Sequence, residues 1–190
     1  MSATHPEWAV VLGGADSVWE DLLEWESRYG HQWDGLVIAA NDVGSHWPRE
    51  LDHWVSLHPH KFRYWEPTRQ EQGLPNGYVR WGIDRHRTLV DRQVLSVWGG
   101  GSSGMLAVQV AHLVGCSRAI LCGVPMTPTP HFAETQERFP GTWRSAAGHW
   151  RAWARCVTLM RPWVRSMSGR TRELLGEPTY EWLVNPEPPT

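Results

Sequence analysis

The sequence predicts a single α/β domain built as a Rossmann-like parallel sheet with flanking helices. Short apolar runs alternate with segments of helical periodicity along the 190 residues, a pattern typical of parallel strands joined by crossover helices. Glycine-rich turns follow two of the apolar runs, where a strand would pass into a helix. A chain of this length suits one domain, which can bury roughly 70% of its unfolded surface.

The first third of the chain is predicted to hold two buried strands with a helix between them. Trp8–Leu12 and Leu36–Ala40 are continuous apolar runs of strand length, as expected for strands that are covered on both faces. Ser17 and Glu20 have the spacing of a capping box, which predicts that a helix begins there. A shorter strand is predicted at Trp54–Leu57.

The middle of the chain is predicted to alternate between loop and regular structure. Residues 64–92 are polar and contain prolines and glycines, so we expect a loop or lid there. Gln93–Trp98 predicts a strand, and the turn Gly99–Gly104 is expected to lead into a helix. Arg118–Cys122 predicts a central strand of the sheet.

The C-terminal part is predicted to complete the fold. Aromatic and apolar residues recur at helical spacing, which predicts a helix over Trp150–Trp163. Val164–Met167 is expected to form a last strand. The tail from residue 186 is expected to be frayed.

The composition favours a small anionic ligand over a polyanion. The formal net charge is -2, and all basic residues but one are arginines, which suit bidentate contacts with phosphate and carboxylate groups. The chain has no basic run, so nucleic-acid binding is disfavoured. The 14 tryptophans have no fixed period and are expected mainly in the core.

The cysteines and the lack of targeting patterns in the sequence indicate the cellular compartment. Three cysteines, an odd number, lie in apolar segments and are expected to be reduced thiols. No signal-peptide pattern and no apolar run of membrane-spanning length are apparent, so we expect a cytoplasmic protein without a membrane span. A homo-oligomer is compatible with the sequence.

The two glycine-rich turns predict a phosphate-binding site. Glycines let a ligand approach the backbone, and a helix N-terminus offers N–H donors and a positive dipole end. The second turn lacks the terminal Gly-Lys-Ser/Thr of a Walker A loop. In parallel sheets both turns would lie at the carboxyl edge, where ligands bind. The predicted nucleotide-binding residues are Gly13, Gly14, Ser17, Asn41, His58, Ser102, Ser103 and Gly104.

His149 is the candidate general base. It follows Gly148 at the predicted start of a helix, where the positive dipole end favours a neutral imidazole; a capping or surface role is the alternative. The segment Gly100–Gly104 also matches Gly-x-Ser-x-Gly, which would make Ser102 the nucleophile of a serine hydrolase. The histidine spacing in the segment 53–60 fits no familiar metal-ligand pattern, so no metal is expected.

In chain order, these residues resemble the bacterial sialyltransferase family that uses CMP-sialic acid and the related flagellin-type glycosyltransferases. The resemblance covers about residues 8–168. The turn at 13–17 is similar to the family's Gly-Asn-Gly-Pro-Ser, and Asn41 matches an Asn after the second strand. Ser102–Gly104 is similar to a Thr-Ser-Gly motif. Gly14 and His58 stand where the family has Asn.

The resemblance implies a metal-independent, inverting transferase that acts on a nucleotide sugar and an unidentified acceptor. His149 would take the proton from the acceptor hydroxyl, and His131 and Arg144 would contact the leaving phosphate. No cofactor is implied beyond the nucleotide or nucleotide sugar. The alternative is a non-catalytic nucleotide-binding module, a sensor or sequestering protein, since the glycine turns are retained while a donor-binding Asn is lost. A Rossmann-type protein that cleaves N-glycosidic bonds is a further alternative.

Overall fold

A computed structural model describes residues 8–30, 35–83, 88–133 and 144–184, with the backbone alone for 144–147. In these residues one parallel sheet has seven strands in the order β5-β4-β3-β2-β1-β6-β7. The strands are β1 (Trp8–Leu12), β2 (Leu36–Ala40), β3 (His53–Val55), β4 (Val79–Ile83), β5 (Arg92–Val94), β6 (Arg118–Cys122) and β7 (Val164–Ser166).

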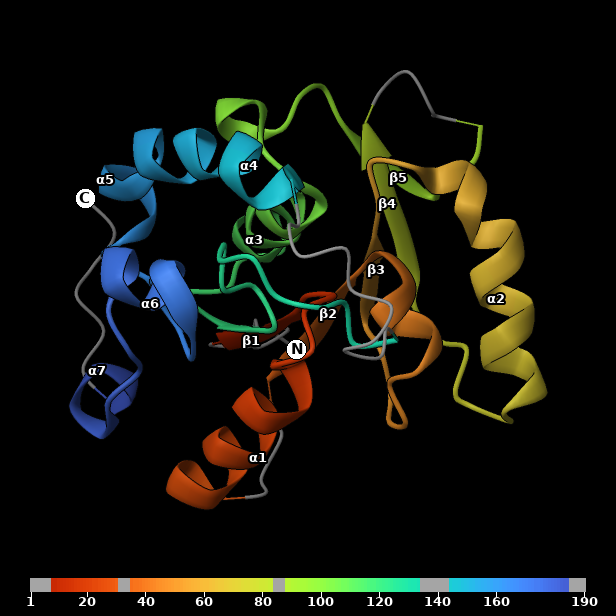
Figure 1. Ribbon diagram of the computed structural model, residues 1–190. Helices are drawn as coiled ribbons and strands as arrows, with labels where there is room; N and C mark the ends of the chain where they lie inside the picture. Colours follow the sequence, from red (N-terminus) through yellow and green to blue (C-terminus); the bar gives the residue numbers. More distant parts are fainter. Residues whose placement is uncertain (1–7, 31–34, 84–87, 134–143, 185–190) are drawn as a thin grey trace, which may run out of the picture.

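Helices join the strands and cover both faces of the sheet (Figure 1). The α-helices are α1 (Val18–Tyr29), α2 (Phe62–Glu71), α3 (Ser103–Leu113), α4 (Arg144–Arg155), α5 (Val157–Met160), α6 (Gly169–Leu175) and α7 (Tyr180–Val184). Within the described residues the connections contain the 3-10 turns η1 (Asn41–Ser45), η2 (Pro59–Lys61) and η4 (Trp98–Gly100). The expected α/β fold is confirmed.

The alternation of side chains along each strand builds two cores. On β1, Ala9 and Val11 face α3 and α4, whereas Val10 and Leu12 face α1 and α2. All four are fully buried, which explains why the strand is apolar at every position rather than at alternate ones. Figure 1 shows α1 and α4 on opposite sides of the sheet.

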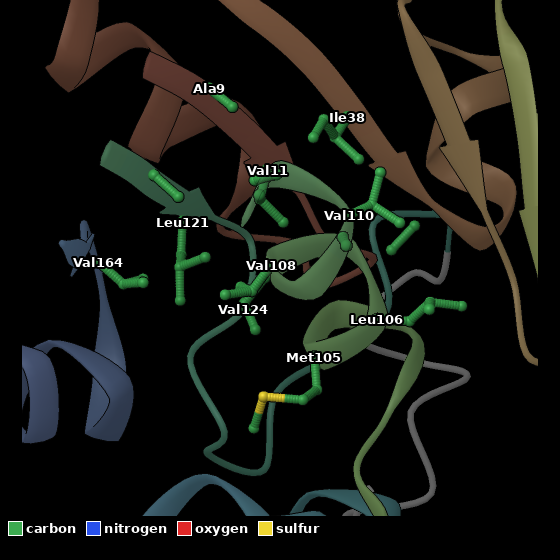
Figure 2. Close-up of a cluster of buried hydrophobic side chains, with 14 of the residues drawn as sticks. Ala9, Val11, Ile38, Met105, Leu106, Val108, Val110, Leu121, Val124 and Val164 are labelled. Atoms are coloured by element: carbon green, nitrogen blue, oxygen red, sulfur yellow. The ribbon is translucent and has the colours of Figure 1, made fainter. Parts of the chain in front are cut away.

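Helix α3 is the buried centre of one core. Every residue from Ser103 to Ala111 is buried, as expected for a helix that is apolar around most of its circumference. Figure 2 shows its side chains Val108 and Val110 beside those of β1, β2 and β6. This packing fixes the N-terminus of α3 against the end of the sheet.

The strand order creates a crevice at the carboxyl edge. From β1 the chain extends through β2, β3, β4 and β5 on one side, and then returns to place β6 and β7 on the other side. The pairs of β1 with β2 and β6 are both parallel, so their carboxyl ends lie at one edge. Such a reversal is the topological switch point at which open α/β sheets bind ligands.

The prediction of a loop or lid over 64–92 is wrong. Most of α2 and all of β4 lie in this segment, and β5 begins at its end. Pro67 stands inside α2, and helix propensity counts against it. Tertiary contacts overcome that cost, because Phe62 packs its ring against Trp54 at 5.4 Å between centroids.

Arg69 shows how strongly tertiary contacts determine this region. Its side chain is 0% exposed and donates to the carbonyl oxygens of Gly44, Trp47, Arg49 and Pro75 at 2.7–2.8 Å. Burial lowers the pKa of Arg69, and the interaction with Tyr78 offsets a part of this decrease. The guanidinium therefore ties α2 to the connection that begins at η1.

Other boundaries also differ from the sequence prediction. The strand expected at Gln93–Trp98 is the shorter β5, and the helix expected at Trp150–Trp163 begins earlier, at Arg144, and breaks at Cys156. The expected strands β1, β2, β6 and β7 and helix α3 are confirmed. The tail from residue 186 lies outside the described residues.

The three cysteines are free thiols, with Cys116 and Cys122 buried and Cys156 half-buried. Burial raises the pKa of Cys116 to about 12, so this thiol is protonated at neutral pH. None of the helices in the described part of the chain is long and apolar enough to cross a membrane.

Candidate functional site

A cavity of about 390 Å³ lies at the carboxyl edge of the sheet, within the range typical of small-molecule sites. Its lining consists of Gly13, Gly14, Ala40, Asn41, Asp42, Leu57, His58, Ser102, Ser103, Gly104, Gly123, Val124, Met126, His131 and His149. The structure thus brings together the residues predicted from sequence, except Ser17 and Arg144. Ser17 does not line the cavity, and the Arg144 side chain lies outside what the structure describes.

The N-terminus of α3 supplies hydrogen-bond donors to the cavity. Leu106 N donates to Ser102 O in the first turn, so the N–H groups before it have no acceptor within the helix. Ser102 precedes the helix without capping it, and its Oγ is buried without a hydrogen-bond partner among the described residues. N–H groups that have no acceptor within their helix, at its positive end, are suited to an anion.

Ser103 has a structural role beside this terminus. Its side chain is 6% exposed, and its Oγ accepts a hydrogen bond from Leu57 N at 3.1 Å. This bond joins the segment after β3 to the start of α3. A large residue at position 103 would therefore disrupt the joint, so the adjacent Ser102 is the better place to probe ligand contact.

Backbone N–H groups of the turn after β1 are already bonded within the protein, contrary to the expectation that they bind a phosphate. Three N–H groups of the turn donate to carbonyl oxygens at the end of β6 and in the loop that follows it. The bonds are Gly13 N to Cys122 O at 2.8 Å, Ala15 N to Gly123 O at 3.2 Å and Asp16 N to Pro130 O at 3.0 Å. The turn thus shapes the cavity wall, and these three donors are unavailable to a ligand.

Ser17 does not form the predicted capping box. Its backbone is helical, its side chain makes no capping bond, and its hydroxyl lies 3.3 Å from Ser168 Oγ and 3.5 Å from Asp21 Oδ2. The Ser17 hydroxyl thus contacts the Asp21 carboxylate in place of a backbone N–H of the helix. Asp21 is 4% exposed and accepts from Gly123 N and Ser168 Oγ, both at 2.7 Å. Asp21 therefore joins α1 to Gly123 in the cavity wall.

The ionisation of Asp21 yields a prediction on stability. Burial raises its pKa above the ordinary value more than its hydrogen bonds lower it. An acid with a raised folded-state pKa contributes stability below its unfolded pKa and loses it as pH rises through the folded pKa. Relative to an Asp21→Asn variant, the wild type should therefore lose unfolding free energy as pH rises above about 4, the ordinary pKa of an aspartate. Urea unfolding of both proteins across this range checks the sign, and a constant difference would contradict it.

Asn41 combines unusual backbone geometry with an open donor group. Its φ is 62° and that of Met126 is 52°; such values are uncommon outside glycine, and both residues line the cavity. The Asn41 Oδ1 accepts from Ser56 Oγ at 2.9 Å, and Ser56 Oγ accepts from His58 N at 2.9 Å. The Asn41 Nδ2 has no acceptor among the described residues, so it can donate to a ligand.

Asp42 and His131 form a pair that sequence reasoning did not connect. His131 Nε2 lies 3.2 Å from Asp42 Oδ1, and Ala133 N donates to His131 Nδ1 at 3.3 Å. Because Nδ1 accepts, Nε2 carries the proton that is donated to Asp42. Burial raises the pKa of Asp42, but hydrogen bonds, above all the one from His131, outweigh this effect and leave the pKa below the ordinary value. A separation of 89 residues left no local signal for the pair.

His149 lines the cavity from α4, but not from a helix N-terminus. It is the sixth residue of a helix that begins at Arg144, so the predicted effect of the helix end does not apply. Two contacts hold α4 in place. Arg155 Nη2 donates to Gly99 O at 2.8 Å, and the Arg170 guanidinium lies 3.9 Å from the ring centroid of Trp150.

The serine-hydrolase alternative gains no support from this geometry. A nucleophilic serine needs a base within hydrogen-bond reach, and Ser102 Oγ has no such partner among the described residues. The two acidic residues between Ser102 and His149 in the chain, Glu134 and Glu137, lie outside the described residues. In the described part of the chain no three His, Cys, Asp or Glu side chains are grouped so as to hold a metal ion.

Fold and cavity together define the class, an open parallel α/β domain with a ligand-sized cavity at its switch point. No protein family and no curated protein matches the sequence. The solved structure of MAf glycosyltransferase from Magnetospirillum magneticum AMB-1 has a similar fold, with a TM-score of 0.59 and 12% sequence identity. The match covers 89% of this chain and 33% of that one, so this chain spans about a third of the length of that protein.

Proposed function

We propose that the protein is a glycosyltransferase-like protein that binds a nucleotide sugar in the cavity at the carboxyl edge. The observation that carries the proposal is the convergence of the α3 N-terminus, the open amide donors of Asn41 and three histidines on one cavity. The similarity in fold to MAf glycosyltransferase supports it.

The charge of the lining favours a donor with a single phosphate. The described lining residues include His58, His131 and His149 but neither lysine nor arginine. A diphosphate usually needs stronger cationic partners, whereas a monoanionic phosphodiester suits a helix N-terminus and imidazoles. A CMP-linked sugar, which the sialyltransferase resemblance also implies, is therefore the proposed donor.

The proposed reaction is an inverting transfer with His149 as general base. The acceptor hydroxyl would lose its proton to an imidazole nitrogen of His149 while its oxygen bonds to the anomeric carbon. The bond from that carbon to the phosphate oxygen breaks on the opposite face, and the electron pair leaves with the phosphate. Backbone N–H groups at the start of α3 would stabilise the leaving group without a metal; the ring nitrogens of His131 face Asp42 and Ala133 and are not assigned this role.

A ligand screen followed by a turnover assay tests the proposal. CMP, UMP, GDP, ADP and their sugar conjugates are added to the protein, and thermal unfolding is recorded. A ligand at 100 times its dissociation constant stabilises a fold by about 2.7 kcal/mol, which gives a measurable shift. We expect CMP and a CMP-linked sugar to shift unfolding most. No shift with any nucleotide would contradict the proposal.

A non-catalytic nucleotide-binding module is the second candidate. It is favoured by the occupied donors of the turn after β1 and by His131, whose two ring nitrogens both face protein partners. Binding without turnover of the sugar nucleotide, in the presence of varied acceptors, would favour this module over the transferase.

A further inference from the structure

Asp42 places a carboxylate in a cavity that is proposed to hold an anion. It is the second residue after β2 and the second of η1, and its side chain is 34% exposed. Its pKa lies below the ordinary value, so it is ionised at neutral pH. A phosphate cannot lie against this group without electrostatic cost, which leaves the α3 N-terminus as the anion position.

An ionised carboxylate accepts hydrogen bonds and donates none. Asp42 Oδ1 accepts from His131 Nε2, while Oδ2 has no hydrogen bond from another residue among those described. The part of the ligand that faces Asp42 must therefore carry donors. Since the cavity is proposed to hold a nucleotide, the hydroxyl groups of the ribose are neutral donors of this kind, and unlike the donors of the base they are shared by all ribonucleotides.

We propose that Asp42 binds the 2′- and 3′-hydroxyl groups of the nucleotide ribose and that His131 is its positioning residue. In open α/β sheets an acidic residue near the end of the second strand is well placed for this contact. His131 holds one carboxylate oxygen, and Ala133 N fixes the tautomer that donates to it. The inference rests on the proposed nucleotide site and adds selection for ribonucleotides.

The test compares ribonucleotides with their 2′-deoxy counterparts. Isothermal titration measures the affinities of CMP, UMP, GMP and AMP and of the four deoxy forms. Hydrogen bonds to charged groups are worth enough to give a preference of about tenfold or more for the ribonucleotide. In Asp42→Ala this ratio should fall to about one. The ratio compares two ligands on one protein, so a general loss of stability does not produce that result.

Two further variants separate positioning from packing. A glutamine amide can donate from nearly the place of His131 Nε2, so His131→Gln should keep the ribose preference, whereas His131→Ala should reduce it. Glu20→Gln removes a negative charge from an exposed residue of α1 outside the cavity and should leave the ratio unchanged.

Each outcome is decisive for one claim. Equal affinities of the wild type for ribonucleotides and deoxynucleotides would overturn the role of Asp42 and leave the proposed function standing. A ribose preference that persists in Asp42→Ala would do the same. Failure of all eight nucleotides to bind would overturn the proposed nucleotide site and this inference with it.

Discussion

Replacing His149 by alanine is expected to reduce turnover of the sugar nucleotide by about 10²–10⁴-fold, the usual contribution of a general base. The residue lines the cavity from α4, apart from the α3 N-terminus that would hold the phosphate. Nucleotide affinity should therefore stay close to that of the wild type. Initial rates and titration of the nucleotide, measured on both proteins, test the two halves of the prediction.

The matched control is His60→Ala. His60 is exposed in η2 and does not line the cavity, so its removal should change neither rate nor affinity. Full activity in His149→Ala would remove His149 from the mechanism. A parallel loss of affinity and rate would instead assign it to ligand binding.

Gly13→Ala is expected to destabilise the fold by about 3 kcal/mol or more. A Cβ at Gly13 would overlap the Gly123 carbonyl oxygen and lie 2.6 Å from Val124 Cγ2. The backbone oxygen belongs to the turn that follows β6 and cannot move away without breaking the bond from Ala15 N. Overpacking of this kind is at the upper end of single-substitution effects. Urea unfolding measures the loss.

Gly77→Ala is the control for this prediction. A Cβ there would meet no heavy atom within 4 Å, and the residue does not adopt a positive φ. Its unfolding free energy should change by less than about 0.5 kcal/mol. A Gly13→Ala protein as stable as Gly77→Ala would show that the two turns can separate at no cost. The close approach of Gly13 to Gly123 would then not account for a glycine at this position.

The predictions for His149→Ala and Gly13→Ala reflect two groups of residues in the site, which have different physical roles. Gly13 and Ser103 line the cavity, yet the contacts of both are with the protein itself. Ser102, Asn41 and His149 carry polar atoms without a partner of their own among the described residues. Substitutions in the first group should act mainly on stability, and those in the second on ligand affinity or rate.

Local sequence was sufficient for the central strands of the sheet and for the edge at which the cavity lies, but not for β4, which lies in the segment predicted as a loop. A strand buried on both faces must be apolar at every position, so β1, β2 and β6 are apparent as short continuous runs. Glycine turns and Asn41 directly after such runs must then gather at the carboxyl edge, because parallel strands all end there. That inference needs only strand order along the chain and the parallel arrangement.

Tertiary structure decided which of these residues have hydrogen-bonding groups that are not already bonded within the protein and can therefore bind a ligand. The turn after β1 has the composition of a phosphate loop, but contacts with residues more than 100 positions away occupy three of its donors. Arg69 and its carbonyl partners stabilise a helix where composition predicted a loop. Asp42 became a candidate only through His131, 89 residues away. Local sequence determines which groups a segment carries, whereas long-range packing determines which of them are already bonded, and only the remainder can bind a ligand.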